Sequence, residues 1–304
     1  MFSPELIETL NDAAVAAARS SFSMRGRGDR KGADQLAVEA MRTVLDSSSF
    51  GFEVVVGEGE KDQAPMLSVG EVLGKGSLSF DIAVDPLEGT NYVAKGQPGA
   101  ISVIVCSERG SIQSLPGYYM NKVVAPKSAS GSISLLDAPE ELVFKVADHS
   151  HKQLRDVTVA ILEKPRNREL INSVRALGAR VVEVPDGDVV AAYEVLTRRY
   201  DLLLGVGGAP EGVIMAALAN CLDGHFQGRL EPQSDVERRS IAKRDSSALD
   251  VTFSGNDLCA ADSVVVIASV TGTASMAEPH YDGGDLLITS SVISKSKIEV
   301  FTNR

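Results

Sequence analysis

Residues 79–90, SFDIAVDPLEGT, end an apolar run with two carboxylates three positions apart, Asp85 and Glu88. Pro86 has no backbone N–H and interrupts the hydrogen bonding of a strand, while Gly89 permits a sharp turn. Two like charges 4 Å apart repel each other by about 4 kcal/mol in an effective dielectric of about 20. A proton or a bound cation relieves that repulsion. The segment therefore predicts either an Asp-Pro surface turn or one wall of a cation site.

Other carboxylates also stand at the ends of expected elements. Glu58 follows the apolar run VVVG, with Glu60 as a further candidate, and Asp34 lies near the start of an expected helix. Glu211 follows GVGGAP at a helix N-terminus, where free backbone N–H groups favour an anion. Oxygen ligands without nearby His or Cys favour a hard ion such as Mg²⁺ or Mn²⁺. Together these acids predict one metal cluster, although each alone is also typical of a turn or helix cap.

Thr90 supplies a hydroxyl directly after this acidic segment. Beside a two-metal site, such a hydroxyl can orient the water that attacks a phosphate. Lys164 and Arg166 flank Pro165 at an expected strand end and can bind a second phosphate, although solvated surface charges are the commoner case. The chemistry indicated is metal-assisted hydrolysis of a phosphate ester.

The hexapeptide DPLEGT resembles the D-P-[IL]-[DE]-G-T signature of the lithium-sensitive, metal-dependent sugar and inositol phosphatases. The surrounding blocks resemble one branch of that superfamily, the class II fructose-1,6-bisphosphatases, in order and spacing from about residue 30 to residue 230. These blocks are KGADQLAVEAMR, VVVGEGEKDQAPML, DPLEGTN, LEKPRN, VPDGDV and GVGGAPEGVIMAAL. Past Arg229 the likeness thins.

The resemblance implies an α/β fold, a layered αβαβα sandwich of two α/β units with the active site between them. It also implies hydrolysis of the 1-phosphate of fructose 1,6-bisphosphate to fructose 6-phosphate, in gluconeogenesis. Asp34 and Glu58 match ligands of one metal, Asp85, Glu88 and Glu211 match ligands of a second, and Thr90 matches the residue that activates the water. The matched substrate positions are Glu88, Gly89, Thr90, Tyr119, Lys164, Pro165, Arg166, Asp186, Gly187, Asp188 and Gly208.

Three alternatives to this function stay open. Sedoheptulose 1,7-bisphosphate or an inositol phosphate is the substrate in two of them. In the third, the chain is a catalytically silent sensor of phosphosugars on the same fold. Every matched metal position keeps a carboxylate and Thr90 is present, which argues against the silent sensor.

The expected elements can be placed from the apolar pattern. Residues 4–20 carry a helical stripe, and a second amphipathic helix begins near residues 33–34. After about residue 156, strands and helices alternate, which predicts a parallel sheet with polar residues at its strand ends. We expect an N-terminal metal-binding domain over 1–150 and a substrate-binding domain over 151–304, or a first domain that also receives the last strands.

Composition restricts the possible partners of this 304-residue chain. A net charge of −11 and few aromatic residues argue against nucleic acid, and no apolar run approaches the length of a membrane span. Cys106, Cys221 and Cys259 have no metal-ligand spacing and are expected to be reduced thiols of a cytoplasmic protein. A homo-oligomer is expected because soluble enzymes commonly form one. The basic segment RGRGDRK is interpreted as a solvated loop, with an anion site or a subunit contact as alternatives.

Overall fold

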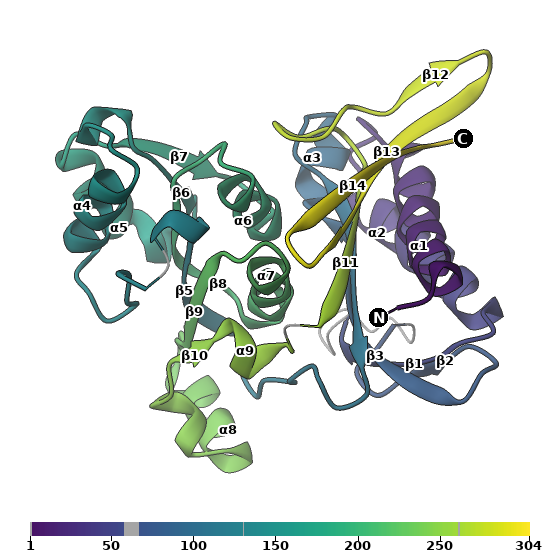
Figure 1. The fold of residues 1–304 in the computed structure, drawn as a ribbon, viewed down its shortest axis with the longest axis horizontal. Helices are drawn as coiled ribbons and strands as arrows, with labels where there is room; N and C mark the ends of the chain where they lie inside the picture. The colour runs from purple at the N-terminus through teal and green to yellow at the C-terminus, as the bar shows by residue number, and fades with distance from the viewer. Residues whose placement is uncertain (1, 58–66, 130, 261) are drawn as a thin grey trace. The chain divides into compact units, whose positions relative to one another are not determined.

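The computed structural model describes residues 2–57, 67–129, 131–260 and 262–304. The chain forms two compact units (Figure 1). Unit 1 comprises Met1–Gln113 and Ala260–Arg304, and unit 2 comprises Ser114–Cys259. The division therefore falls well before residue 150, because the strand over 119–125 pairs on both sides with later strands of unit 2.

Unit 1 contains an eight-stranded sheet in the order β12-β13-β11-β4-β3-β1-β2, with β14 paired to β13. The final strands return to the N-terminal ones, since β11 pairs antiparallel with β4. Its helices are α1 (Pro4–Phe22), α2 (Arg30–Ser47) and α3 (Thr90–Lys95). Its strands are β1 (Gly51–Val56), β2 (Val72–Leu73), β3 (Leu78–Glu88), β4 (Ile101–Glu108), β11 (Ser263–Ser269), β12 (His280–Asp282), β13 (Asp285–Ser294) and β14 (Lys297–Asn303).

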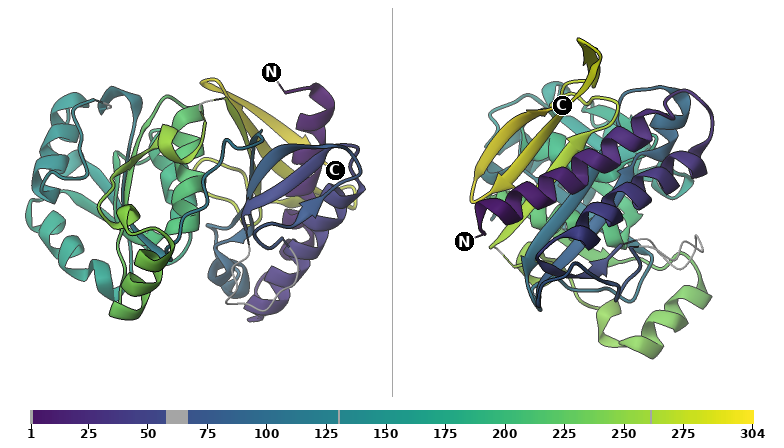
Figure 2. Two further views of the ribbon diagram at one scale, coloured as in Figure 1. Left: turned by 90° about the horizontal axis from the view of Figure 1, so that it is seen from below. Right: turned by 90° about the vertical axis from the view of Figure 1, so that its right-hand side faces the viewer.

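Helices α1 and α2 cover one face of this sheet (Figure 2). The stripe predicted on α1 is buried as expected at Leu6, Leu10, Ala13, Ala14 and Ala17. Helix α2 begins earlier than predicted because Asp29 caps it, accepting a 2.9 Å hydrogen bond from Gly32 N. These helices and the sheet enclose the larger apolar core of the unit.

Unit 2 contains a six-stranded sheet in the order β10-β9-β5-β8-β6-β7. The predicted parallel arrangement holds for β6, β7 and β8, whereas β5 joins antiparallel to β8 and β9. Its strands are β5 (Tyr119–Ala125), β6 (Thr158–Leu162), β7 (Arg180–Val184), β8 (Leu202–Gly208), β9 (His225–Leu230) and β10 (Phe253–Ser254). Its helices are α4 (Pro139–His149), α5 (Arg168–Ala176), α6 (Asp188–Leu196), α7 (Ala209–Cys221), α8 (Asp235–Arg244) and α9 (Gly255–Leu258).

The sheet of unit 2 lies between two helical layers (Figure 1). Helices α4 and α5 enclose an apolar core on one face, and α6 and α7 pack on the other. The predicted α/β class is confirmed. Unit 1 contains one helical layer and one sheet, and unit 2 contains a sheet between two helical layers. Among the described helices, none combines the length and apolar character needed to cross a membrane.

Candidate active site

The end of β3 carries the acidic segment of unit 1. The pairing of β3 with β4 shifts register between Asp85 and Glu88, which is a β-bulge, and Asp85 Oδ1 accepts a 3.1 Å hydrogen bond from Leu87 N. A bulge bends its strand and redirects the side chains beside it. Glu88 is buried and Asp85 half-buried at this bulge.

Gly89 joins the end of β3 to α3, whose first residue is Thr90. Its φ of +89° favours glycine, and a Cβ there would lie 3.1 Å from Gly99 O. The turn leaves Thr90 half-buried at a helix N-terminus, directly after the acids of β3. Glycine at position 89 therefore permits the turn that brings the Thr90 hydroxyl close behind Glu88.

The remaining predicted metal ligands are distributed over the chain. Asp34 is half-buried in the second turn of α2, which packs on β3 and α3. Glu58 and Glu60 lie outside the described residues, and Glu211 belongs to unit 2. Among the residues that the structure describes, no three His, Cys, Asp or Glu side chains form a group able to hold a metal ion. The five-ligand cluster therefore remains a prediction.

The basic segment after α1 packs against α3 through its backbone. Gly26 N and Gly28 N donate to the carbonyls of Val93 and Ala94, and Arg25 forms an ion pair with Glu278. The exposed cations of this segment are Arg27, Arg30 and Lys31. The segment thus holds α3 beside the start of α2. Its interpretation as a solvated loop fits Arg27 but is wrong for Arg30 and Lys31, which begin helix α2.

In unit 2, the predicted substrate residues gather at one edge of the sheet. Lys164, Asp186 and Gly208 follow or end the parallel strands β6, β7 and β8, so they occupy the carboxyl ends of those strands. Tyr119 opens the antiparallel β5 and is registered opposite Gly208. The carboxyl ends of parallel strands are where ligands bind in α/β sheets. The structure therefore places residues predicted from separate blocks of sequence along one edge.

Arg166 is held against this edge by two contacts. Its Nε donates to Val206 O at 3.0 Å, and its Cζ lies 4.7 Å from the centroid of the Tyr119 ring. Lys164 Nζ donates to Pro185 O at 2.8 Å, immediately before Asp186. A cation over an aromatic face is attracted to it, and a guanidinium can bind a phosphate through two parallel hydrogen bonds. Lys164 and Arg166, which are predicted to bind a phosphate, are thereby ordered beside two other predicted substrate residues, Tyr119 and Asp186.

A buried lysine lies beneath the same edge. Lys122, on β5, donates from Nζ to Asp188 Oδ2 at 2.5 Å and to Gly208 O at 2.8 Å. Asn167 is also buried and bonds the Leu162 and Val206 carbonyls, each at 3.0 Å. Sequence reasoning missed both residues. A lysine inside the apolar run of β5 was the available signal, because lysine is almost never fully buried without a partner.

Glu211 stands in the first turn of α7, after Pro210. Its Oε2 is buried and makes no hydrogen bond to the described part of the chain. Burial and then the charge of Asp188 raise the pKa of Glu211, while Lys122 lowers it. A buried carboxylate oxygen without a donor is the type of atom that a cation stabilises. Glu211 thus fits the role of metal ligand that the sequence predicts.

The sequence is similar to those of known phosphatases. The sequence profile of a family described as bacterial fructose-1,6-bisphosphatase, glpX-encoded, matches residues 4–303. A D-fructose 1,6-bisphosphatase class 2/sedoheptulose 1,7-bisphosphatase of a Synechococcus strain is 36% identical over 318 residues, covering 95% of this chain and 90% of that protein. A protein of the same name from a Synechocystis strain is 41% identical over 252 residues, covering 78% and 72%.

Among solved structures, the extragenic suppressor protein suhB from Bartonella henselae is similar at 16% sequence identity. The match covers 66% of this chain and 75% of that chain, with a TM-score of 0.37. This likeness is too distant to support a conclusion about the present chain.

Proposed function

The chain belongs to the bacterial, glpX-encoded class II fructose-1,6-bisphosphatase family and is a phosphoric monoester hydrolase. From this premise we propose which residues bind the substrate and which hydrolyse it. The substrate is fructose 1,6-bisphosphate, and hydrolysis of its 1-phosphate yields fructose 6-phosphate and phosphate. The observation that carries the proposal is the convergence of Tyr119, Lys164, Arg166 and Gly208 on one sheet edge of unit 2.

The edge of unit 2 binds the part of the substrate that does not react. Arg166 and Lys164 bind the phosphate that is retained, and their contacts with Tyr119 and Pro185 O reduce the number of conformations lost on binding. Asp186 and Asp188 accept hydrogen bonds from the sugar hydroxyls. Binding of these remote groups positions the 1-phosphate for attack.

Two divalent cations, Mg²⁺ or Mn²⁺, are proposed cofactors of this reaction. Asp34 and Glu58 would hold one, and Asp85, Glu88 and Glu211 the other. The Oε2 atom of Glu211 is buried and accepts no hydrogen bond from the described residues, which supports the assignment. When bound, the cations supply positive charge to the phosphate oxygens and lower the pKa of the attacking water.

Thr90 acts on the water that attacks phosphorus. Its hydroxyl is a donor and an acceptor, so it can fix the orientation of a water molecule by one hydrogen bond. Its place after the bulge of β3 supports this role, because the acidic segment ends β3 at Glu88 and the hydroxyl opens α3 two residues later. The scissile P–O bond breaks as the water oxygen bonds to phosphorus from the opposite side.

Sedoheptulose 1,7-bisphosphate is a second candidate substrate, because the Synechococcus and Synechocystis relatives are named for both bisphosphates. Phosphate release from the two sugar bisphosphates and from an inositol monophosphate tests the assignment. The proposal expects both sugar bisphosphates to exceed the inositol phosphate in kcat/KM. Preference for the inositol phosphate, or no release from any of the three, would contradict it.

The enzyme is further proposed to serve gluconeogenesis in the cytoplasm as a homo-oligomer. The three cysteines are buried and form no disulfide, as in proteins of a reducing compartment. Sedimentation of the purified chain measures the oligomeric state directly, and a single monomeric species at micromolar concentration would contradict that part of the proposal.

A further inference from the structure

Lys122 is a fully buried cation on β5, an interior strand of the sheet of unit 2. Only 1% of its side chain is exposed, and β5 lies between β8 and β9. Its partner Asp188 has a side chain that is 7% exposed. Removing two charges from water costs several kcal/mol per ion, and a buried pair often contributes little net stability. Two apolar residues in place of the pair would therefore cost the fold little, which raises the question of what the pair does.

The two acceptors of Lys122 belong to two different strand-to-helix turns. Asp188 is the first residue of α6 and follows Gly187, whose φ of +79° is left-handed. Gly208 is the N-cap of α7, three residues before Glu211. One ammonium group thus links the turn after β7 to the turn after β8. These are the two turns that carry the proposed sugar contacts and a proposed metal ligand.

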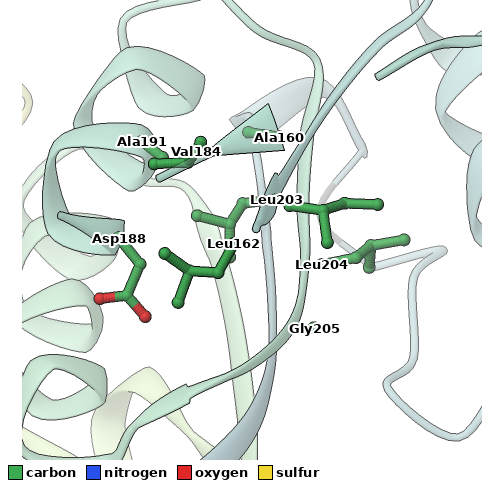
Figure 3. Close-up of a pocket in the computed structure, with 9 residues that line it drawn as sticks. Ala160, Leu162, Val184, Asp188, Ala191, Leu203, Leu204 and Gly205 are labelled. Atoms are coloured by element: carbon green, nitrogen blue, oxygen red, sulfur yellow. The ribbon is translucent and has the colours of Figure 1, made fainter. Parts of the chain in front are cut away.

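The space around this link is filled. A Cβ at Gly207 would overlap Asp188 Oδ2 and would lie 2.9 Å from Lys122 Nζ, and a Cβ at Gly208 would overlap Glu211 Oε2. The Gly-Gly step of GVGGAPEG is therefore required by the packing of these three charged side chains. Figure 3 shows Asp188 at the start of α6 beside Leu162, where both line a small, otherwise apolar cavity. The Asp188 residue thus borders apolar side chains, while its Oδ2 accepts a hydrogen bond from Lys122.

We propose that Lys122 is a positioning residue of the phosphatase reaction, which orients the Asp188 carboxylate toward the sugar and holds the Gly208 turn against it. The proposal rests on the function proposed above. Lys122 engages Oδ2 of Asp188, and Oδ1 is the oxygen assigned to a sugar hydroxyl. Lys122 itself is buried beneath the proposed binding edge, with 1% of its side chain exposed.

A structural role alone makes a different prediction. A pair that only stabilises the fold affects the free energy of unfolding and leaves substrate affinity unchanged in the folded fraction. A positioning residue changes KM and product affinity at temperatures where the variant is fully folded. The two roles are therefore separated by measurements on the folded protein.

The test compares Lys122→Met with Lys145→Met in the full chain. Lys145 forms an ion pair in the same unit, with Asp137 at 2.7 Å and Glu141 at 2.8 Å, and lies on α4 in the opposite helical layer. Both variants are assayed for KM and kcat with fructose 1,6-bisphosphate, for calorimetric binding of fructose 6-phosphate, and for thermal unfolding. For Lys122→Met we expect KM and the product Kd to rise about tenfold or more, as for a misplaced binding group. Lys145→Met should leave both constants unchanged.

Unchanged KM and product affinity in a folded Lys122→Met variant would overturn the proposal. If that variant does not fold, Lys122→Arg is the variant that tests the proposal. Its guanidinium keeps the positive charge but cannot take the position of a single ammonium group. A raised KM in folded Lys122→Arg supports positioning, and wild-type KM there contradicts it. Failure of the wild-type chain to hydrolyse fructose 1,6-bisphosphate would instead contradict the proposed function, so the two failures are distinguishable.

Discussion

The two units place their functional carboxylates by different means. In unit 1, the backbone positions Asp85 and Glu88 through a bulge, a turn at Gly89 and a hydrogen bond from Leu87 N. In unit 2, a buried side chain does so, because Lys122 holds Asp188 and the Gly208 carbonyl. In unit 2 the ammonium group of Lys122 offsets the charge of the Asp188 carboxylate, which suits that acid to hydroxyl groups more than to a cation.

Strand β3 carries a third carboxylate, Asp81, whose role differs from the roles proposed for Asp85 and Glu88. Asp81 lies on β3 only four residues before Asp85, yet it is 1% exposed and forms a 2.6 Å ion pair with Arg109. Its Oδ2 also accepts from Gly110 N at 2.7 Å and Ser111 N at 3.1 Å. Asp81 thus stabilises the turn after β4 and has no part in the proposed chemistry. The partner of an acid, rather than its sequence neighbours, determines its role.

The largest expected effect concerns the proposed catalytic group of unit 1. Thr90→Ala removes the hydroxyl that orients the attacking water, so kcat should fall by about 100-fold or more while KM changes little. Steady-state kinetics on fructose 1,6-bisphosphate measure both constants. Thr43→Ala is the matched control, since Thr43 is exposed on α2 and its hydroxyl donates to Glu39 O of the same helix. Near wild-type kcat in Thr90→Ala would remove Thr90 from the mechanism.

Asp81 should affect stability and not kinetics. Asp81→Asn leaves Arg109 without a buried carboxylate and should lower the free energy of unfolding by about 1–3 kcal/mol. Urea titration measures this loss. Glu53→Gln is the control, because Glu53 contacts the same Arg109 but is 27% exposed at its side chain, and exposed pairs contribute about 0–1 kcal/mol. A changed KM in Asp81→Asn would show that this acid is not purely structural.

In unit 2, Arg166 should determine substrate affinity more than turnover. Arg166→Ala removes a charged ligand of the retained phosphate, so KM should rise about tenfold, equivalent to about 1.4 kcal/mol, with a smaller change in kcat. The exposed Arg168, two positions along the chain, supplies the control Arg168→Ala. Equal KM values for the two variants would place the retained phosphate elsewhere.

Tyr119 should give the smallest effect, since its ring supports Arg166 from one side. Tyr119→Leu removes the aromatic face and should raise KM about twofold to fivefold, in keeping with about 0.5–1 kcal/mol for an exposed cation–π contact. Tyr119→Phe keeps the face and loses the hydroxyl. If Tyr119→Phe raises KM as much as Tyr119→Leu, the hydroxyl contacts the substrate and the ring is not the important part.

Much of the fold could be predicted from local patterns. The stripe on α1, the strands around DPLEGT and the alternation after residue 156 are properties of short segments, and the structure follows them. Leu36 is an apolar residue of the amphipathic helix α2, yet it is 36% exposed, because that helix turns it away from the core. Local periodicity thus predicts the positions of helices and strands more accurately than the burial of individual side chains.

The unit boundary and Lys122 depend on contacts between distant residues. Strand β5 belongs to unit 2 because it pairs with strands that follow it by about 80 and 100 residues, which no local pattern contains. Lys122 and Asp188 are 66 positions apart, so their pairing is visible only once the sheet is assembled. The resemblance of short blocks identified the edge residues of unit 2, but not the lysine that supports them.

The most direct test of the two-unit division of labour is the metal dependence of phosphate release from fructose 1,6-bisphosphate. Initial rates are measured for the wild-type chain with Mn²⁺ or Mg²⁺, after addition of a chelator, and after the cation is restored. The carboxylates placed by the backbone of unit 1 predict that chelation abolishes release and that the restored cation recovers it. An unchanged rate in the presence of the chelator would contradict the proposed role of those carboxylates.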